Sequence, residues 1–445
     1  MAVEFFSNPS GVPNVPNGWN VAAIENLCSR VTSGATPLRS NAEYYDAGTI
    51  PWIRTQELKD GIIRESAQKI TPAALKETSA KLFPVDTVLM AMYGDGKTIT
   101  SLGILGIEAA TNQACCAMIT DPTRCLPRFL FYNLRHHRDD IIHIATGGAQ
   151  RNLSGAIIRR FAISVPPLDE QAVITGILGT LDDKIEQNRK MNETLEAMAR
   201  ALFKSWFVDF DPVRAKAEGR DPGLPVHIVA LFPDSFEDSE IGEIPTGWSV
   251  LGLDDTARFL NGLAMQKFPP KGDRFLPVIK ISQLRAGDMT GADKASADLA
   301  PEYVVEDGDV LFSWSGSLEC VLWPGGRGAL NQHLFKVTSK KFPKWFYFLW
   351  IHWHLEDFRH IAAGKATTMG HIQRHHLTSA KVLVPPPELL QAMSGFMHPI
   401  IESIWRRKVQ SRTLAALRDM LLPKLISGEL RVPEAAGLTS VPGMR

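Results

Sequence analysis

A long helical pattern in the middle of the chain constrains its fold more than any other feature. The pattern opens at Pro166-Pro167-Leu168-Asp169-Glu170-Gln171 and runs to residue 210. Alternating steps of four and three residues follow a coiled-coil seam that is apolar at both ends and polar in the middle. A helix of this length, roughly 50 Å at 1.5 Å per residue, is too long for one small domain and needs a partner helix. The seam consists of Ile174, Leu178, Leu181, Ile185, Asn188, Asn192, Leu195, Ala199, Leu202 and Trp206.

The chain contains a second stretch of the same kind. Pro385-Pro386-Pro387-Glu388 through Gln391 repeats the proline-rich opening, and another seam with a polar middle follows. Either stretch alone is better explained as an ordinary core helix, but the pair predicts two helices packed on each other, in which the polar positions set the register. Pro399 and Pro423 predict that the second helix is kinked or ends early. The second seam consists of Leu390, Met393, Met397, Ile400, Ile404, Arg407, Ser411, Leu414, Arg418, Leu421 and Leu425.

Each of the two helical stretches lies at the end of one copy of an internal sequence repeat. Pro16-Asn17-Gly18-Trp19 returns as Pro245-Thr246-Gly247-Trp248, and Thr111-Asn112-Gln113 is matched by Leu330-Asn331-Gln332. Further runs correspond in pattern and keep their order along the chain, which indicates an internal repeat. These runs are 50–58 with 276–284, 86–94 with 308–316, and 127–132 with 343–348.

Each copy mixes strand-like and helix-like patterns. Short β-branched and aromatic runs between Gly, Pro and Asn turns predict strands, and residues 129–143 and 345–361 predict amphipathic helices. The expected fold is therefore α+β, with two similar globular domains, two long helices packed together and a pseudo-twofold internal repeat. The expected segments are a first globular domain (1–165), a first helix (166–210), a linker with the second globular domain (211–384), a second helix (385–432) and a tail (433–445).

The charge pattern allows a nucleic-acid partner without requiring one. The 48 basic and 48 acidic residues balance, but residues 122–165 and 340–384 are both locally basic. Charged runs often only solvate a surface, although their recurrence at equivalent places favours a functional role. Five cysteines without paired spacing, no signal peptide and no apolar run of membrane-spanning length predict a cytoplasmic protein.

No motif for covalent chemistry is recognisable in the sequence. Gly94-Asp95-Gly96-Lys97-Thr98 ends like a phosphate-binding loop, but Ala91 stands where the GxxxxGK[ST] pattern needs glycine. The histidines between residues 352 and 376 do not have a recognisable metal-ligand spacing. We therefore expect a chain with no catalytic residues, no metal site and no cofactor of its own.

The combination of motifs resembles the specificity subunit of type I restriction-modification systems. The resemblance rests on Pro16-Asn17-Gly18-Trp19, on Pro166 to Gln171 with the helix that follows, and on the stretch from Leu422 to Val432. It covers nearly the full chain and implies that the two long helices pack as an antiparallel coiled coil. The second opening, Glu388-Leu389-Leu390-Gln391, lacks the acidic pair before glutamine that the first copy has, which leaves local docking geometry open.

The resemblance implies a DNA-recognition subunit that is not itself an enzyme. Each globular domain would be a target-recognition domain for one half of a split double-stranded DNA site, and the helices would set the gap. Two methyltransferase subunits, which hold S-adenosylmethionine, would dock on this chain, and restriction (motor-nuclease) subunits using ATP and Mg would join them. Two other hypotheses stay open from the residues alone: a stand-alone duplicated DNA-processing enzyme, and a scaffold whose repeated domains bind protein.

Candidate DNA-contacting residues follow from side-chain chemistry and position. Arg and Lys commonly pair with guanine, and Asn or Gln with adenine. Residues of these types in or beside the polar turns after strand-like runs are candidates, although each is equally well explained as a solvated surface residue. They are Arg54, Gln56, Lys97, Gln150 and Arg151 in the first domain, and Lys280, Gln283, Lys365, His371 and Arg374 in the second.

A second set of candidates lies on the first long helix. A two-helix coil covers one side of each helix, so apolar residues off the seam are expected to be partly exposed and to mark an interaction surface. We expect methyltransferase subunits to dock there, although the globular domains could instead fold back over some of these residues. The candidates for docking are Met191, Met198, Phe203 and Phe207.

Overall fold

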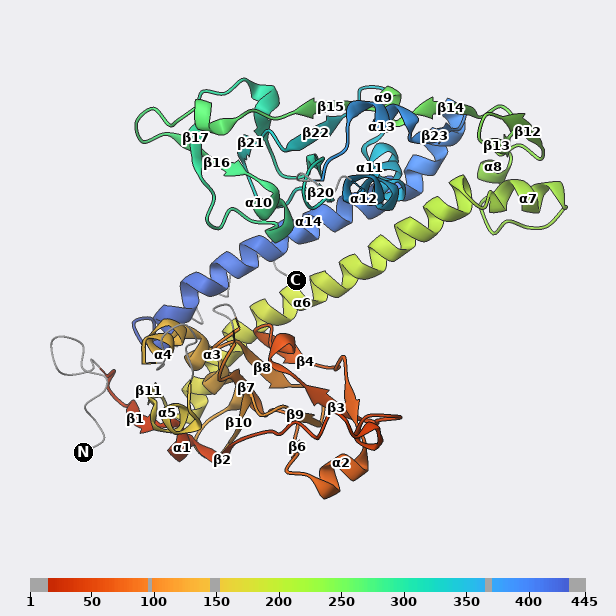
Figure 1. Cartoon of the computed structure of the whole chain (residues 1–445). Helices are drawn as coiled ribbons and strands as arrows, with labels where there is room; N and C mark the ends of the chain where they lie inside the picture. The colour runs from red at the N-terminus through yellow and green to blue at the C-terminus, as the bar shows by residue number, and fades with distance from the viewer. Residues whose placement is uncertain (1–14, 95–97, 145–152, 365–369, 432–445) are drawn as a thin grey trace. The chain divides into compact units, whose positions relative to one another are not determined.

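The computed structural model describes residues 15–94, 98–144, 153–364 and 370–431 (Figure 1). The chain divides into two compact units. The first unit comprises residues 1–183 and 415–445, and the second comprises residues 184–414. Each unit therefore contains one copy of the repeat together with a piece of both long helices. We call residues 15–165 the first head and residues 245–384 the second head.

The first head has two principal sheets, of strand order β2-β10-β7-β8-β4 and β5-β3-β9-β6. Alternate side chains of strand β7 enter different clusters. Val88 and Met90 pack with helix α3, whereas Leu89 and Ala91 pack with Ile53 of strand β3. The strands are β1 (Asn20–Ala23), β2 (Cys28–Ser33), β3 (Ile50–Ile53), β4 (Gly61–Ile63), β5 (Lys69–Ile70), β6 (Leu82–Phe83), β7 (Val88–Ala91), β8 (Leu102–Leu105), β9 (Ala109–Thr111), β10 (Cys115–Thr120) and β11 (Ala162–Val165), and the helices are α1 (Ile24–Leu27), α2 (Pro72–Glu77), α3 (Pro127–His136), α4 (Arg138–Ile144) and α5 (Gly155–Arg160).

Within the described residues, the second head repeats this topology without a counterpart of β4, in sheets of order β15-β22-β19-β20 and β17-β16-β21-β18. The parallel pair β3 with β9 corresponds to the parallel pair β16 with β21. The predicted α+β internal repeat is therefore confirmed. The strands are β14 (Ser249–Gly252), β15 (Arg258–Asn261), β16 (Phe275–Ile279), β17 (Lys294–Ser296), β18 (Val304–Val305), β19 (Val310–Ser313), β20 (Cys320–Leu322), β21 (Gly328–Leu330), β22 (Leu334–Thr338) and β23 (Lys381–Val384), and the helices are α9 (Leu253–Thr256), α10 (Ile281–Ala286), α11 (Lys344–Trp353), α12 (Leu355–Ala363) and α13 (Arg374–Ser379).

The two long helices are α6 (Leu168–Phe207) and α14 (Pro387–Ile426), each of 40 residues. Their side-chain partners show that they run antiparallel, as predicted. In the second unit, Asn188 on α6 donates to Gln410 on α14 at 2.9 Å, and Asn192, one turn further along α6, donates to the carbonyl of Ile404 at 3.2 Å. Both asparagines are buried and donate across the helix pair, whereas their side-chain oxygens have no hydrogen-bond partner among the described residues.

Helix α14 continues through both of its prolines, so the expectation that it ends early is wrong. Pro399 and Pro423 are exposed, and so are the residues one turn earlier, Gly395 and Asp419. A proline deprives the carbonyl four residues before it of its partner. On the solvent side of a helix that carbonyl can bond water instead, so α14 extends to Ile426.

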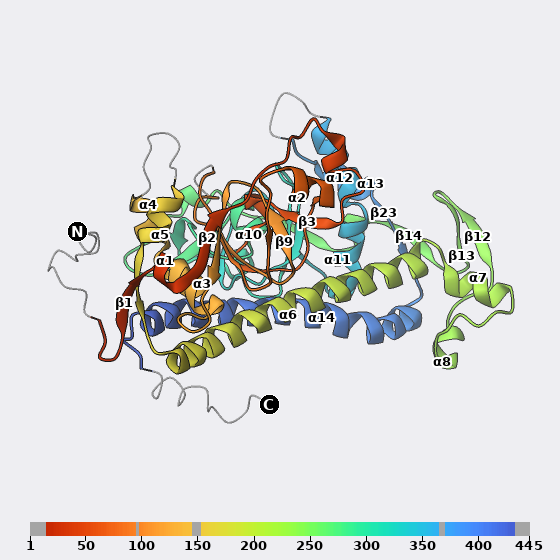
Figure 2. The same cartoon turned by 90° about the horizontal axis from the view of Figure 1, so that it is seen from below.

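The tryptophan of the repeated Pro-x-Gly-Trp motif packs each head against the end of a long helix. Trp19 packs with the last turns of α14, in a cluster that contains Leu425 and Ile426. Trp248 packs in the same way at the end of α6, where its ring lies 5.5 Å from that of Phe207. The segment after α6 forms α7 (Asp211–Ala217), α8 (Val226–Val229) and the hairpin of β12 (Phe236–Ser239) and β13 (Gly242–Pro245), which gather where α6 ends (Figure 2).

Candidate nucleic-acid interface

In the first head, loops that follow three strands come together at one edge. Gly34, just after β2, lies so close to the end of β9 that a Cβ atom would overlap the carbonyl oxygen of Thr111. Ala35 then donates its backbone N–H to that oxygen at 2.9 Å. Only glycine fits so close an approach, which explains why it stands at this position.

The second head contains the same arrangement. A Cβ atom at Gly262, just after β15, would overlap the backbone of Asn331, and the next N–H, that of Leu263, bonds the carbonyl of Leu330 at 3.0 Å. Two further backbone bonds correspond between the heads. In the first head the N–H of Asn112 bonds the carbonyl of Ile53 at 3.0 Å, and in the second head the N–H of Asn331 bonds that of Ile279 at 3.3 Å. Likewise, the N–H of Leu153 bonds the carbonyl of Met92 at 2.8 Å, and the N–H of Ile372 bonds that of Trp314 at 3.0 Å.

The N–H of Met92 bonds the carbonyl of Ala114 at 2.8 Å, and that of Trp314 bonds the carbonyl of His333 at 3.3 Å. With the bonds above, they define an equivalent surface in each head, which we call the loop edge. It comprises residues 33–36, 92–94 and 112–114 in the first head, and residues 261–264, 314–316 and 331–333 in the second. The backbone bonds align Met92 with Trp314, and the repeated Asn-Gln pair aligns Gln113 with Gln332. The two edges therefore share a backbone framework but present different side chains.

In the first loop edge, Gln113 is held between two neighbours. The hydroxyl of Thr36 donates to its carbonyl oxygen, and its side chain also hydrogen-bonds the phenol of Tyr93. Burial raises the pKa of Tyr93, and the bond from Gln113 partly opposes that shift. Tyr93 is nonetheless 37% exposed. The edge thus presents an exposed amide in a fixed position beside an aromatic ring.

The second loop edge is richer in rings. The indole N–H of Trp314 is shared between the side-chain oxygen of Asn261 at 2.9 Å and the backbone oxygen of Gln332 at 3.1 Å. His333 lies 3.0 Å from the hydroxyl of Ser315, and its other ring nitrogen lies 3.3 Å from the amide nitrogen of Gln332. These contacts fix the side chains without burying them, except for that of Ser315.

Two of the predicted DNA-contacting residues border the second loop edge. His371 forms an isolated β-bridge with Ser315, and its ring lies 6.3 Å from that of Trp314. Arg374 begins α13, stacks 5.8 Å from the ring of Phe335 and donates to the carbonyl of Phe259 at 3.3 Å. Both stay candidates, although the contacts of Arg374 also give it a structural role.

The other described candidates lie after strands β3 and β16. Arg54 is half-buried, and its backbone N–H bonds Glu57 at 2.8 Å, while Gln56 is exposed. Their roles stay predictions. Lys280 is exposed and pairs with Asp293. The candidates Lys97, Gln150, Arg151 and Lys365 lie outside the described residues.

The expectation that the side chain of Gln283 is available to contact a DNA base is wrong. Its side chain is buried and donates to the carbonyl of Thr290 at 3.1 Å. It also accepts from the backbone N–H of Lys280 at 3.3 Å, which caps the start of α10. The amide is therefore used inside the head.

The predicted docking set on α6 separates into two pairs. Met191 and Met198 are exposed, at 41% and 48%, and stay candidates for docking. Phe203 and Phe207 are buried, so their expected exposure is wrong. They lie in the core of the second unit because the chain turns back after α6 and the second head covers them. The ring of Phe203, for example, lies 4.9 Å from that of Trp350.

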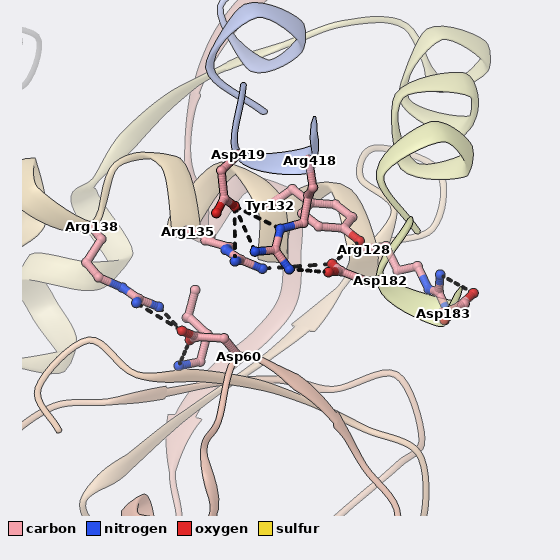
Figure 3. A network of polar contacts seen from close by, with 10 residues as sticks. Asp60, Arg128, Tyr132, Arg135, Arg138, Asp182, Asp183, Arg418 and Asp419 are labelled. Carbon is pink, nitrogen blue, oxygen red and sulfur yellow. Dashed lines mark hydrogen bonds and ion pairs between the residues drawn. The ribbon is translucent and has the colours of Figure 1, made fainter. Parts of the chain in front are cut away.

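In the first unit, a charged network joins the head to the long helices (Figure 3). Asp182 on α6 accepts from Tyr132 on α3 at 2.7 Å, and Asp419 on α14 pairs with Arg135 of α3 at 3.5 Å. Burial, followed by the charge of Asp182, raises the pKa of Tyr132, so the phenol remains a donor. In the second unit, aromatic residues of α6 pack against those of α11.

Among the described residues, no group of His, Cys, Asp and Glu side chains has the geometry of a metal site. Within the same part of the chain, no helix is both long enough and apolar enough to cross a membrane.

The sequence alone did not single out five residues that the structure places at the loop edges: Tyr93, Gln113, Trp314, Gln332 and His333. The repeated Asn-Gln pair was the available signal, because it recurs after equivalent strands in both copies.

Comparisons with known proteins agree on one family. Residues 16–197 and 245–410 match the type I restriction modification DNA specificity domain. The specificity subunit of the type I restriction enzyme MjaIX of Methanocaldococcus jannaschii is 27% identical, with 95% of this chain and 96% of that protein covered. The HindI specificity subunit of Haemophilus influenzae is 24% identical over 70% of this chain and 80% of its own length. The crystal structure of a type I S subunit from M. genitalium has the same fold, with a TM-score of 0.57, 13% identity and coverage of 93% of this chain and 96% of that one.

Proposed function

The chain belongs to the type I restriction-modification DNA specificity family, and from this premise we propose that each of its heads reads one half of a split double-stranded DNA target. The chain is the non-catalytic specificity component of a restriction enzyme. Its own contribution is therefore the choice of DNA sequence, while other subunits carry out the chemistry.

One observation carries the proposal of two half-sites. The heads share strand order and the backbone bonds of the loop edge, yet the side chains at equivalent positions differ, as with Met92 and Trp314. Sequence is read through the hydrogen-bonding groups and rings offered to base edges, whereas the framework only positions them. Two heads with the same backbone framework but different side chains are expected to recognise an asymmetric DNA target.

We further propose that the long helices set the gap between the half-sites and hold the partner subunits. A continuous helix has a fixed rise of about 1.5 Å per residue, so its length can act as a spacer. Methyltransferase subunits with S-adenosylmethionine would dock on this chain, with Met191 and Met198 on α6 as contacts. Restriction subunits that use ATP and Mg would complete the enzyme.

Methylation profiling of host DNA tests the proposed function. The chain is co-expressed with its methyltransferase subunit in a host that otherwise leaves the target unmethylated, and the modified sequences are read genome-wide. We expect one split target that disappears when this chain is omitted. Replacing residues 1–160 with the first head of a relative should change one half of the target and leave the other half intact. A change in both halves, or methylation without this chain, would contradict the proposal.

A further inference from the structure

We propose that the loop edge of each head is its base-reading surface, with Gln113 and Gln332 as equivalent residues that contact base edges in the major groove. The inference rests on the proposed function and assigns it to particular side chains. The adjacent rings, Tyr93 in the first head and Trp314 with His333 in the second, make the two readers different.

The first argument comes from the framework. The close approaches at Gly34 and Gly262 hold the loop after one strand against the end of another, and matched backbone bonds fix both. Glycine and backbone bonds would not be needed in both copies to support an arbitrary surface loop. A rigid edge that tolerates different side chains suits a reader, because hydrogen bonds to bases require donors and acceptors in set positions.

The second argument comes from the hydrogen-bonding capacity of the two amides. A glutamine side chain has two N–H donors and an oxygen with two lone pairs. Gln113 uses its oxygen once, toward Thr36, and bonds Tyr93 once. Gln332 uses its amide nitrogen toward His333. Counting the contacts of the described residues, each amide keeps a donor and an acceptor, which is the pair needed for bidentate contact with adenine.

The third argument comes from the surroundings of each amide. Beside Gln113 stand a phenol and a threonine hydroxyl, which offer polar contacts. Beside Gln332 stand the indole of Trp314, 5.8 Å from the ring of His333, and the amide of Asn261. Apolar ring faces favour the thymine methyl group, and the polar groups favour other base edges. The two edges are therefore suited to different base sequences.

The test uses the complete complex of this chain with its methyltransferase subunit. Its methylation target is profiled for the wild type and for Gln113→Ala, Gln332→Ala and the isosteric Gln332→Glu. We expect Gln113→Ala to relax one position in one half-site and Gln332→Ala to relax one position in the other, each by about tenfold in preference. Gln332→Glu removes the amide donors, so it should shift the preferred base at the same position that Gln332→Ala relaxes.

Gln391→Ala is the matched control, because this glutamine is exposed on α14 and belongs to neither loop edge. It should leave the methylated sequence unchanged. Thermal unfolding and co-purification with the methyltransferase subunit verify that each variant is folded and assembled. Both edge glutamines are at least partly exposed, so truncation should not prevent folding.

The outcomes separate this inference from the proposed function. If the wild-type complex methylates a split target but the folded glutamine variants keep every base preference, the loop edge is not the reader and only this inference fails. Equal weakening at all sequences would indicate a phosphate contact and would also overturn it. If the wild-type complex shows no split target, the proposed function fails and this inference fails with it.

Discussion

The carboxylate of Asp182 on α6 lies 2.6 Å from the guanidinium of Arg418 on α14, inside the first unit. The side chains are largely shielded, with 24% and 12% of their surfaces exposed. Tyr132 and Arg135 of the first head approach the same carboxylate. One acidic group therefore joins the first head to both long helices.

Asp182→Asn should lower the free energy of unfolding of the chain by about 2–3 kcal/mol. Removing this charge leaves the shielded guanidinium groups of Arg135 and Arg418 with less compensation, and breaking a buried pair costs about 3–5 kcal/mol. Partial exposure reduces that value. Urea denaturation followed by circular dichroism measures the change.

The neighbouring residue supplies the matched control. Asp183 makes a bidentate pair with Arg128 at 3.1 Å, but more than half of its surface is exposed. Exposed pairs contribute about 0–1 kcal/mol, so Asp183→Asn should have little effect. Equal losses for the two variants would show that the shielding of Asp182 has no energetic consequence.

The long helices were predictable because the signal for them is local. A seam of period 3.5 and a proline-rich opening lie within one continuous stretch, and Ile174, Leu178 and the two seam asparagines are buried as expected. The burial of Phe203 and Phe207 was not predictable in this way. It depends on the second head, whose covering residues, such as Trp345 and Trp350, lie far along the chain.

The contacts of the loop edge were even less predictable from local sequence patterns. Gly34 contacts Thr111 and Gly262 contacts Asn331, and nothing in the local pattern around either glycine reveals a partner so distant in sequence. The order of strands in the sheets decides which turns meet. Internal repetition partly compensates, because a polar pair conserved between two divergent copies, Asn112-Gln113 and Asn331-Gln332, indicates a shared position even when the contact is unknown.

His352 should make the chain less stable in mild acid. Burial lowers its pKa to about 4, whereas an unfolded histidine has a pKa of about 6.5. Between these values the unfolded chain binds a proton that the folded chain does not, so stability falls as pH drops below 6.5 and the loss is complete near pH 4. His352→Asn keeps a side-chain N–H for the Cys320 carbonyl and removes this titration.

The measurement is the free energy of unfolding at pH 7 and at pH 4.5. The decrease between the two should be smaller for His352→Asn than for the wild type. His360→Asn provides the control, because His360 is exposed on the neighbouring helix α12 and its replacement should not alter the decrease. An identical decrease in all three proteins would contradict the assignment to His352.

Met198→Asp should weaken binding of the methyltransferase subunit without unfolding this chain. Met198 is 48% exposed on α6, so a charge there is tolerated in the free chain but is costly when an apolar partner surface covers it. Phe203→Asp should instead destabilise the second unit, because Phe203 is buried among aromatic rings. Co-purification and circular dichroism distinguish the two effects.

Val226→Asp is the control for an exposed apolar residue away from the long helices, because Val226 is 86% exposed on α8. It should retain the partner at the wild-type level. If folded Met198→Asp also retains the partner fully, this face of α6 is not a docking surface.

Lengthening both long helices together should change the gap in the DNA target. The compact units divide α6 between Asp183 and Lys184 and divide α14 between Leu414 and Ala415. Four residues inserted at each point leave the contacts within each unit intact and add about 6 Å of helix. We expect both half-sites to be kept and the gap to grow by up to about two base pairs, at 3.4 Å each. Methylation profiling measures the gap directly, with replacement of the same positions by alanine, without insertion, as the control. A folded insertion variant that methylates the original target with the original gap would show that helix length does not set the spacing.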